Sequence, residues 1–302
     1  MTTRIPDTTL AARFTPTQHS HPASAIDPSN PQNALPPNQI VVIIGASRGI
    51  GAGIACAYAQ AGAATLALCA RASSAPQLAS IAQSAASLNK HIKTVCYDVD
   101  ITSDDSVSSL VGRIKEEIGR VDIVVLNSGY SGPVVLKVSE GKAQDFKDVF
   151  DVNVNGTYLV ARHFVPLLLE GNGARLFIVV GSFATMITKG HIANTAYCVS
   201  KMAQQRLVEY VSEQYGEEGL ISVGVHPGAV FTKMADSTTP DSFRPYLTDN
   251  VGLCGAFCVW LSKERKEWIN GRLLSAKWDT ADLEQKKKEV VDGDLLKLGL
   301  RL

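Results

Sequence analysis

Short runs of apolar residues alternate with longer stretches of helical composition from residue 40 almost to the C-terminus. The runs are continuously apolar, which is typical of strands covered on both faces, because a strand with one wet face alternates apolar and polar residues. The predicted strands are Ile40–Ile44, Thr65–Cys69, Thr94–Tyr97, Ile123–Leu126, Arg175–Val180, Ser222–His226 and Arg272–Ala276. The predicted helices are Gly51–Ala61, Ala75–Leu88, Ser106–Ile118, Phe146–Leu169, Tyr197–Tyr215 and Leu253–Leu261.

The repetition of strand and helix predicts one α/β domain. Helical crossovers between successive strands make those strands parallel, so we expect a single doubly wound, Rossmann-like sheet of about seven strands with helices on both faces. Ligands of such sheets bind beyond the carboxyl ends of the strands. No internal repeat and no shift of composition marks a second domain within this part of the chain.

Residues 1–38 have a different composition from the rest. They contain seven of the 13 prolines and few apolar residues. A segment with so little to bury cannot offset its own ordering entropy. We therefore predict a flexible Pro-rich N-terminal arm over residues 1–38, or an arm that drapes over a neighbour, followed by a Rossmann-type domain over residues 39–302.

Charge and composition exclude several kinds of partner. Lys plus Arg and Asp plus Glu both number 29, and the longest basic run is Lys286–Lys288, so neither nucleic acid nor an anionic membrane is expected as a partner. No stretch reaches the ~18 uncharged apolar residues of a membrane span, and no secretory signal is recognisable at the N-terminus. The six scattered cysteines are interpreted as small buried residues in a reducing compartment, which predicts a cytoplasmic location. The six histidines have no ligand spacing, so no metal site is expected.

Three glycines follow the first predicted strand at once, in the stretch "IVVIIGASRGIG". Gly45, Gly49 and Gly51 would allow positive φ angles and let a pyrophosphate approach the amides at a helix N-terminus, where the helix dipole favours an anion. Such a turn can also be an ordinary tight turn. Its position between the first strand and the first helix favours a dinucleotide site.

Seven motifs along the chain, in order, resemble those of the short-chain dehydrogenase/reductase family. They are "GASRGIG" at 45–51, "YDVD" at 97–100, "LNSG" at 126–129, "NVNG" at 153–156, "GS" at 181–182, "YCVSK" at 197–201 and "HPGAVFT" at 226–232. The resemblance covers residues 40 to about 280. The Pro-rich start and the closing "INGRLLSAKWD" look most similar to filamentous-fungal members, which points to secondary metabolism.

The catalytic candidates are Tyr197, Lys201, Ser182 and Asn153. Tyr197 and Lys201 are four residues apart and share one helix face. A phenol with a pKa near ~10 is a poor acid–base catalyst at neutral pH, and an adjacent ammonium would lower that pKa. Such a pair alone is common on helix surfaces; its occurrence with the glycine turn favours catalysis. The resemblance implies that Tyr197 gives the proton, Lys201 reaches the nicotinamide ribose, Ser182 orients the substrate oxygen and Asn153 holds a water.

The cofactor is expected to be NADP(H). NAD-preferring folds place an acidic residue at the end of the second strand, whereas Ala70 and Arg71 stand there, and Ser47 and Arg48 lie in the glycine turn. Two guanidinium groups without a carboxylate suit a 2′-phosphate; alternatively, Arg71 only stacks on the adenine. The cofactor-binding residues that the motifs and the resemblance imply are Gly45, Ser47, Arg48, Gly49, Ile50, Gly51, Arg71, Asp98, Val99, Asn127, Gly129, Tyr197, Lys201, Pro227, Gly228, Val230 and Thr232.

The function expected from this pattern is NADPH-dependent reduction of a ketone or aldehyde to an alcohol. The substrate pocket is predicted from three segments rich in Phe, Met, Ile and Val, which favour a fairly apolar small molecule: 130–136, 183–192 and 231–247. Lys189 and His191 leave room for an acidic or phenolic substituent. Two alternatives stay open, a non-redox epimerisation or isomerisation with bound cofactor, and a catalytically idle NADP-binding regulatory protein.

Three features depart from the common family pattern. Ile44 stands where a threonine often braces the turn, Ser182 and Tyr197 are 15 positions apart, and "AKWD" occupies 276–279. These departures affect the prediction of the substrate pocket more than the prediction of the chemistry. The long, partly apolar helices at 146–169 and 197–215, together with the resemblance, predict a homodimer or homotetramer.

Overall fold

A computed structural model describes residues 11–190 and 192–300 of the chain. Within them seven parallel strands form one sheet in the order β3-β2-β1-β4-β5-β6-β7, as the sequence predicts. The strands are β1 Ile40–Ile44, β2 Thr65–Ala70, β3 Lys93–Asp98, β4 Ile123–Leu126, β5 Leu176–Val180, β6 Ile221–His226 and β7 Leu273–Ser275.

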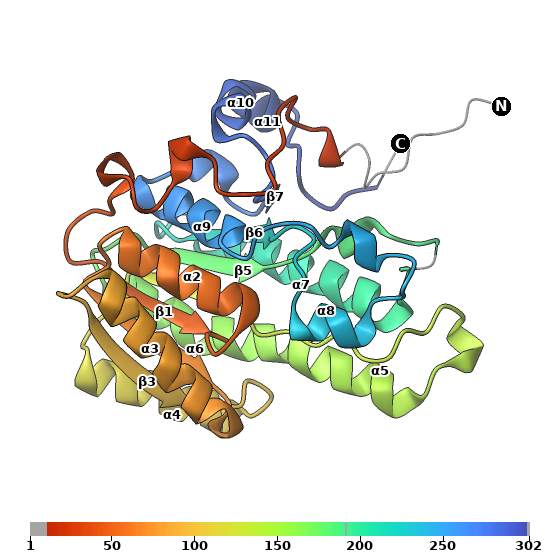
Figure 1. The fold of residues 1–302 in the computed structure, drawn as a ribbon, viewed down its shortest axis with the longest axis horizontal. Coiled ribbons are helices and arrows are strands. Elements are labelled where there is room, and N and C mark those ends of the chain that lie inside the picture. Colours follow the sequence, from red (N-terminus) through yellow and green to blue (C-terminus); the bar gives the residue numbers. More distant parts are fainter. Residues whose placement is uncertain (1–10, 191, 301–302) are drawn as a thin grey trace.

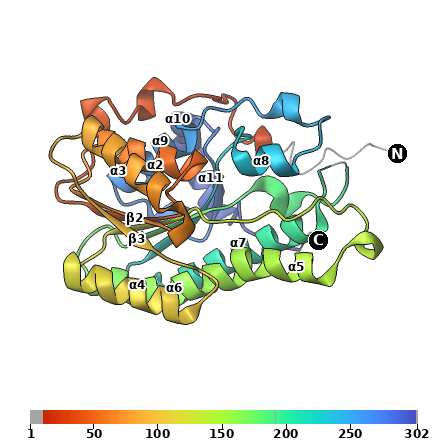
Figure 2. The ribbon, with the colours of Figure 1, turned by 60° about the horizontal axis from the view of Figure 1, so that its bottom comes forward.

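Helices cover both faces of the sheet (Figures 1 and 2). On one face lie α2 Gly49–Gln60, α3 Ala75–Leu88 and α9 Leu253–Lys263; on the other lie α4 Asp104–Glu117, α6 Gly156–Glu170 and α7 Thr195–Tyr215. Each face has its own apolar core, and every residue of β1, β2, β4 and β5 is buried. This double burial explains why these strands are continuously apolar in the sequence.

The order of the strands places a topological switch point between β1 and β4. Chain connections leave β1 toward β2 and β3 on one side and continue from β4 toward β7 on the other. The crevice beyond the carboxyl ends of β1 and β4 is therefore where a doubly wound sheet binds its ligand. The glycine turn after β1 and the "LNSG" segment after β4 both lie there.

One predicted helix is wrong in its continuity. The stretch predicted as a helix over 146–169 consists of α5 Ala143–Phe150, a π-helical turn Asp151–Asn155, and α6. A π-turn inserts an extra residue into the helical ladder, and hydropathy periodicity does not register that insertion. The short helices α8 Lys233–Thr238, α10 Thr280–Gln285 and α11 Lys287–Asp292 were also not predicted.

Residues 11–38 pack along the chain's own C-terminal region. The Phe14 ring lies 5.0 Å from the Trp278 ring, and the Trp278 indole N–H donates to the Ala11 carbonyl at 2.9 Å. Ile26 and Leu35 are buried in the core beside α2 and α9. A few apolar residues, rather than a high average hydropathy, account for the packing of this part of the arm. The predicted flexibility of the arm stays a prediction, and residues 1–10 lie outside the described residues.

The cysteines are less uniformly buried than the sequence suggests. Cys96 is exposed and Cys56 is half-buried, and the other four are buried. All six are free thiols. Among the described helices none is long and apolar enough to cross a membrane.

Candidate active site

The glycine turn connects β1 to α2 by a very close approach of the backbone to itself. A Cβ on Gly51 would stand 2.0 Å from the Gly45 carbonyl oxygen, and a Cβ on Gly45 would stand 2.7 Å from the Ser128 amide nitrogen. Gly45 and Gly49 have φ angles of 91° and 54°, which favour glycine. Gly45 and Gly51 thus serve the protein's own packing, a reason for these glycines that the sequence interpretation did not include.

The turn is braced by an amide where the family often has a hydroxyl. The Asn127 side chain, just after β4, donates to the Gly45 carbonyl at 2.9 Å. The amides of Asn127 and Ser128 donate to the Ile44 carbonyl at 2.8 and 3.0 Å. These bonds hold the ends of β1 and β4 together although Ile44 has no hydroxyl to offer. The Asn127 side chain therefore holds the glycine turn in its conformation.

The N-terminus of α2 is suited to an anion. Arg48 is the residue before the first turn, and no side chain caps the helix there. The first amides of a helix have no partner within the helix, and the dipole makes them attractive to a phosphate. The residues present therefore fit the pyrophosphate of a dinucleotide.

Arg48 and Arg71 lie on the same edge of the sheet. Ile44 of β1 pairs with Cys69 of β2, and Arg71 follows two residues later. Both guanidinium groups are on exposed residues. The positions suit a phosphate near the end of β2.

Asp98, at the end of β3, is engaged within the protein. The Arg113 guanidinium donates to its carboxylate at 3.0 Å, and this hydrogen bond lowers the pKa of Asp98. The neighbouring Val99 is buried and its amide donates to the Ala70 carbonyl. Neither residue lines the cavity described below, so any contact with an adenine would take place further along the sheet edge.

Ser182 and Tyr197 meet at the carboxyl end of β5. Ser182 follows β5 by two positions, and its hydroxyl oxygen accepts from the Ala184 amide at 3.0 Å, capping the 3₁₀ turn Phe183–Met186. This fixes the oxygen and leaves its proton to be donated. Burial raises the pKa of Tyr197 to about 12, against the opposing effect of its hydrogen bond with Ser182. The phenol is therefore protonated at neutral pH.

Lys201 lies one helical turn beyond Tyr197 and is buried, with 4% of its surface exposed. Its ammonium donates to the Val180 carbonyl at 3.1 Å and to Gln204 Oε1 at 2.8 Å, and it stands 5.8 Å from the centre of the Tyr197 ring. Burial lowers the pKa of Lys201 to about 8. Burial is the largest influence on the Tyr197 pKa in this structure, and a lowering of that pKa by the Lys201 ammonium stays a prediction.

Asn153 belongs to the π-helical turn and is fully buried. Both protons of its amide are used, at 2.7 Å to the Tyr130 carbonyl and at 2.9 Å to the Ser200 hydroxyl, and its oxygen accepts from the Tyr130 amide at 2.9 Å. One acceptor position is left. Asn153 thus ties the segment after β4 to α7. Gly129 lies between Asn153 and Lys201: a Cβ on this glycine would stand 3.5 Å from Asn153 Oδ1 and 3.7 Å from Lys201 Nζ.

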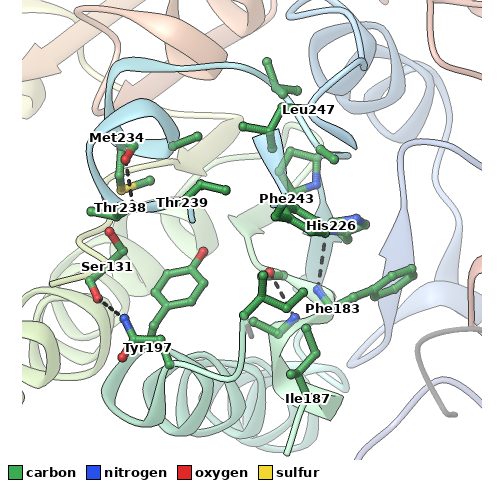
Figure 3. A pocket seen from close by; sticks show the side chains of 18 of the residues that line it. Ser131, Phe183, Ile187, Tyr197, His226, Met234, Thr238, Thr239, Phe243 and Leu247 are labelled. Carbon is green, nitrogen blue, oxygen red and sulfur yellow. Dashed lines mark hydrogen bonds between the residues drawn. The ribbon is translucent and has the colours of Figure 1, made fainter. Parts of the chain in front are cut away.

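A cavity of about 820 Å³ opens beside Tyr197 and Ser182 (Figure 3). All three predicted segments contribute to it: Ser131 and Val134 from the first, Phe183 and Ile187 among the second, and the stretch up to Leu247 from the third. Ile50 of the glycine turn and the predicted cofactor residues Pro227, Gly228, Val230 and Thr232 also line it. Lys189 lines it as well, whereas His191 lies outside the described residues.

His226, the last residue of β6, lines the cavity, although the sequence interpretation gave this histidine no role of its own. Its ring stacks on Phe183 with 4.3 Å between centres, and the Phe183 amide lies 3.4 Å from its Nδ1. Burial and the charge of Lys277 lower the pKa of His226 to about 3. It is a neutral wall of the cavity. Its place at a strand end and its place at the start of the "HPGAVFT" motif were the signals in the sequence that could have indicated this.

The sheet and the glycine turn at its switch point define a Rossmann-type dinucleotide fold. The short chain dehydrogenase family model matches residues 39–242. The short chain dehydrogenase pgmD of Aspergillus terreus (strain NIH 2624 / FGSC A1156) is 37% identical, over 94% of this chain and 93% of its own. The short chain dehydrogenase mpl6 of Monascus purpureus is 35% identical, over 87% and 88%.

A solved structure of a short chain dehydrogenase from Escherichia coli CFT073, complexed with NADPH, is similar as well. It is 25% identical, has a TM-score of 0.71, and covers 81% of this chain and 98% of its own. The chain belongs to the short chain dehydrogenase family, whose members are oxidoreductases, and it resembles members from filamentous fungi. The resemblance stated from the motifs is confirmed.

The buried ammonium of Lys201 gives a pH-dependent stability that can be measured. Both folded and unfolded chains carry the proton at pH 7, so the cost of burying the charge is present in full. Between about pH 8 and the ordinary value of 10.5 the folded chain has released a proton that the unfolded chain keeps, so stability rises with pH. We expect the free energy of unfolding in urea, wild type minus Lys201→Met, to be larger at pH 10 than at pH 7 by up to about 3 kcal/mol.

Lys90→Met is the control for this experiment, because Lys90 is exposed and its removal leaves the burial of Lys201 untouched. It should follow wild type at both pH values. Parallel pH dependence of wild type and Lys201→Met would contradict a depressed Lys201 pKa.

Proposed function

We propose that the protein is an NADPH-dependent oxidoreductase that reduces a ketone or aldehyde of a fairly apolar small molecule to an alcohol. The observation that carries this proposal is the contact between Ser182 and Tyr197 in the lining of the cavity, with the buried Lys201 ammonium 5.8 Å from the centre of the Tyr197 ring. Residues 39–302 would form the catalytic domain. The similarity to an NADPH-complexed short chain dehydrogenase supports the choice of cofactor class.

NADPH would supply the hydride, and the protein must orient the carbonyl and give a proton. The Ser182 oxygen accepts from the Ala184 amide and its hydroxyl is hydrogen-bonded with Tyr197 in this structure; with a substrate bound, the same hydroxyl would donate to the carbonyl oxygen. Tyr197 is a protonated phenol and would give its proton to the same oxygen. Lys201, held by Val180 and Gln204, would bind ribose hydroxyls and favour the phenolate after the proton has left. Asn153 would act by positioning Tyr130 and α7.

The cavity supports an apolar substrate. Phe183, Ile187, Met234, Phe243 and Leu247 lie around it in Figure 3, with the Tyr197 hydroxyl reaching in from one side. Apolar walls with a few convergent polar groups are typical of small-molecule sites. Lys189, on the exposed part of the lining, would tolerate an acidic or phenolic substituent. The relatives from filamentous fungi support a role in secondary metabolism.

We further propose a homodimer or homotetramer in the cytoplasm. The helices α5, α6 and α7 expose apolar and aromatic side chains that a second copy could cover: Phe146, Tyr158, Val199, Met202 and Tyr210. Analytical ultracentrifugation tests this, and a monomer at micromolar concentration would exclude it.

Tyr197→Phe should remove the proton donor and little else. We expect a panel of ketones, aldehydes and quinones to contain one class that makes the wild-type protein oxidise NADPH, and the variant to lose at least ~100-fold in kcat, since a positioned general acid contributes that much. NADPH affinity, measured by cofactor fluorescence, should stay near that of wild type. Product formed without net NADPH oxidation would instead support epimerisation or isomerisation, and tight binding without any product would support a regulatory protein.

Arg71→Ala tests the preference for NADPH. Loss of a charged partner for the 2′-phosphate should weaken NADPH binding about 10-fold or more and leave NADH binding unchanged. Arg265→Ala is the matched control, because Arg265 is a surface arginine paired with Glu267, and neither residue is assigned to the cofactor site. Equal losses for the two cofactors in Arg71→Ala would mean that the guanidinium only stacks on the adenine.

A further inference from the structure

The turn after β6 is held by a buried carboxylate from a distant part of the chain. Asp249 has 1% of its side chain exposed, and its Oδ2 accepts from the Ala229 amide at 2.6 Å. The Asp249 amide donates in return to the Ala229 carbonyl at 3.1 Å. Ala229 is thereby bonded through both of its backbone groups to one residue 20 positions away.

The same carboxylate has a cationic partner. Lys277, just after β7, pairs with Asp249 Oδ1. Burying a carboxylate is costly unless it is paired and hydrogen-bonded, and here it has both an ammonium and an amide. The pair is therefore a single unit in which the ammonium holds the carboxylate in place.

The N-terminal arm supports this unit from outside. The His19 amide donates to the Lys277 carbonyl at 2.7 Å, and the Asn250 amide donates to the Ser20 carbonyl at 2.7 Å. One strand-like segment of the arm thus bonds the backbone beside both members of the pair. The arm lies outside the part of the chain that matches the family model.

The turn that Asp249 holds lines the cavity beside the glycine turn. Gly228 has a φ of 95°, and a Cβ there would stand 2.8 Å from Asp249 Oδ2. Thr232, shortly after the turn, would lie 3.3 Å from a Cβ on Gly49. The turn after β6 and the turn after β1 are thus the two sides of one crevice. A glycine-containing turn has many accessible conformations, so a fixed shape needs an external partner.

We propose that Asp249 is a positioning residue that, paired with Lys277, holds residues 227–230 in their cofactor-binding shape. The inference rests on the proposed function, because it assumes that NADPH occupies this crevice. Asp249 touches the backbone of the turn rather than the reacting atoms. Its loss leaves the Ala229 amide without a partner and lets the turn move away from the crevice.

The primary test compares NADPH binding in the full-length protein and its Asp249→Ala, Asp249→Asn and Lys277→Met variants. Asp249→Ala should raise the Kd for NADPH at least ~10-fold, and kcat at saturating NADPH should change far less than KM. Asp249→Asn should lose less than Asp249→Ala, because its amide oxygen can still accept from Ala229 while it no longer pairs with Lys277. Lys277→Met leaves the buried carboxylate without its cation and should raise the Kd at least as much as Asp249→Asn. If Asp249→Ala does not fold, the two milder variants decide.

The structure offers a matched control in Asp122. This carboxylate is also fully buried, accepts from a backbone amide, that of Ile40, at 2.8 Å, and pairs with a basic side chain, Arg120. It directly precedes β4, at the amino ends of the strands, whereas the crevice lies at their carboxyl ends. Asp122→Asn should lower stability toward urea and leave the Kd for NADPH within ~2-fold of wild type.

Amide hydrogen exchange of residues 228–230 in the cofactor-free protein separates failure of the inference from failure of the proposed function. Faster exchange at Ala229 in Asp249→Ala is expected whether or not NADPH binds. If wild type binds NADPH and Asp249→Ala binds it equally well, or if Asp122→Asn raises the Kd as much as Asp249→Asn, the inference is overturned and the proposed function stands. If wild type does not bind NADPH while exchange at Ala229 still responds, the proposed function has failed and the inference falls with it.

Discussion

The backbone contact between Gly51 and Gly45 is the constraint on which the site depends. With 2.0 Å between the Gly45 oxygen and an ideal Cβ on Gly51, only a glycine lets the first turn of α2 lie against the end of β1. This contact puts the uncapped N-terminus of α2 at the switch point of the sheet, where its amides and dipole face the crevice. The Asn127 amide then ties β4 to the same turn. An anion site follows from how closely the backbone packs.

The proposed catalytic residues lie on the other half of the sheet, and their pKa values depend on burial. β5 delivers Ser182 and α7 delivers Tyr197 and Lys201, and both titratable groups are shifted toward their neutral forms by desolvation. For Tyr197 this keeps the proton available for donation. For Lys201 it is a cost in stability, which two hydrogen bonds partly offset. Such a conflict between stability and position is typical of functional residues.

Local sequence patterns were sufficient for the sheet and for the glycine turn. Continuous apolar runs predict buried parallel strands, and glycines between a strand and a helix predict a close approach, because both depend on near neighbours in the chain. The π-turn at Asn153, the packing of Phe14 on Trp278, and the pairing of Asp249 with Lys277 were not predicted. The first adds one residue to a helix without changing its hydropathy, and the other two join segments that are far apart in the sequence. Asp249 looks like an ordinary surface carboxylate until the fold buries it.

The most direct measurement follows the hydride itself. The purified protein is incubated with apolar ketones and with NADPH that carries deuterium at both C4 positions of the nicotinamide, and the products are analysed by mass spectrometry. Reduction at this site predicts an alcohol that carries one cofactor-derived deuterium on the former carbonyl carbon. An alcohol without the label, or a product of unchanged oxidation state, would contradict the assignment of this cavity to carbonyl reduction.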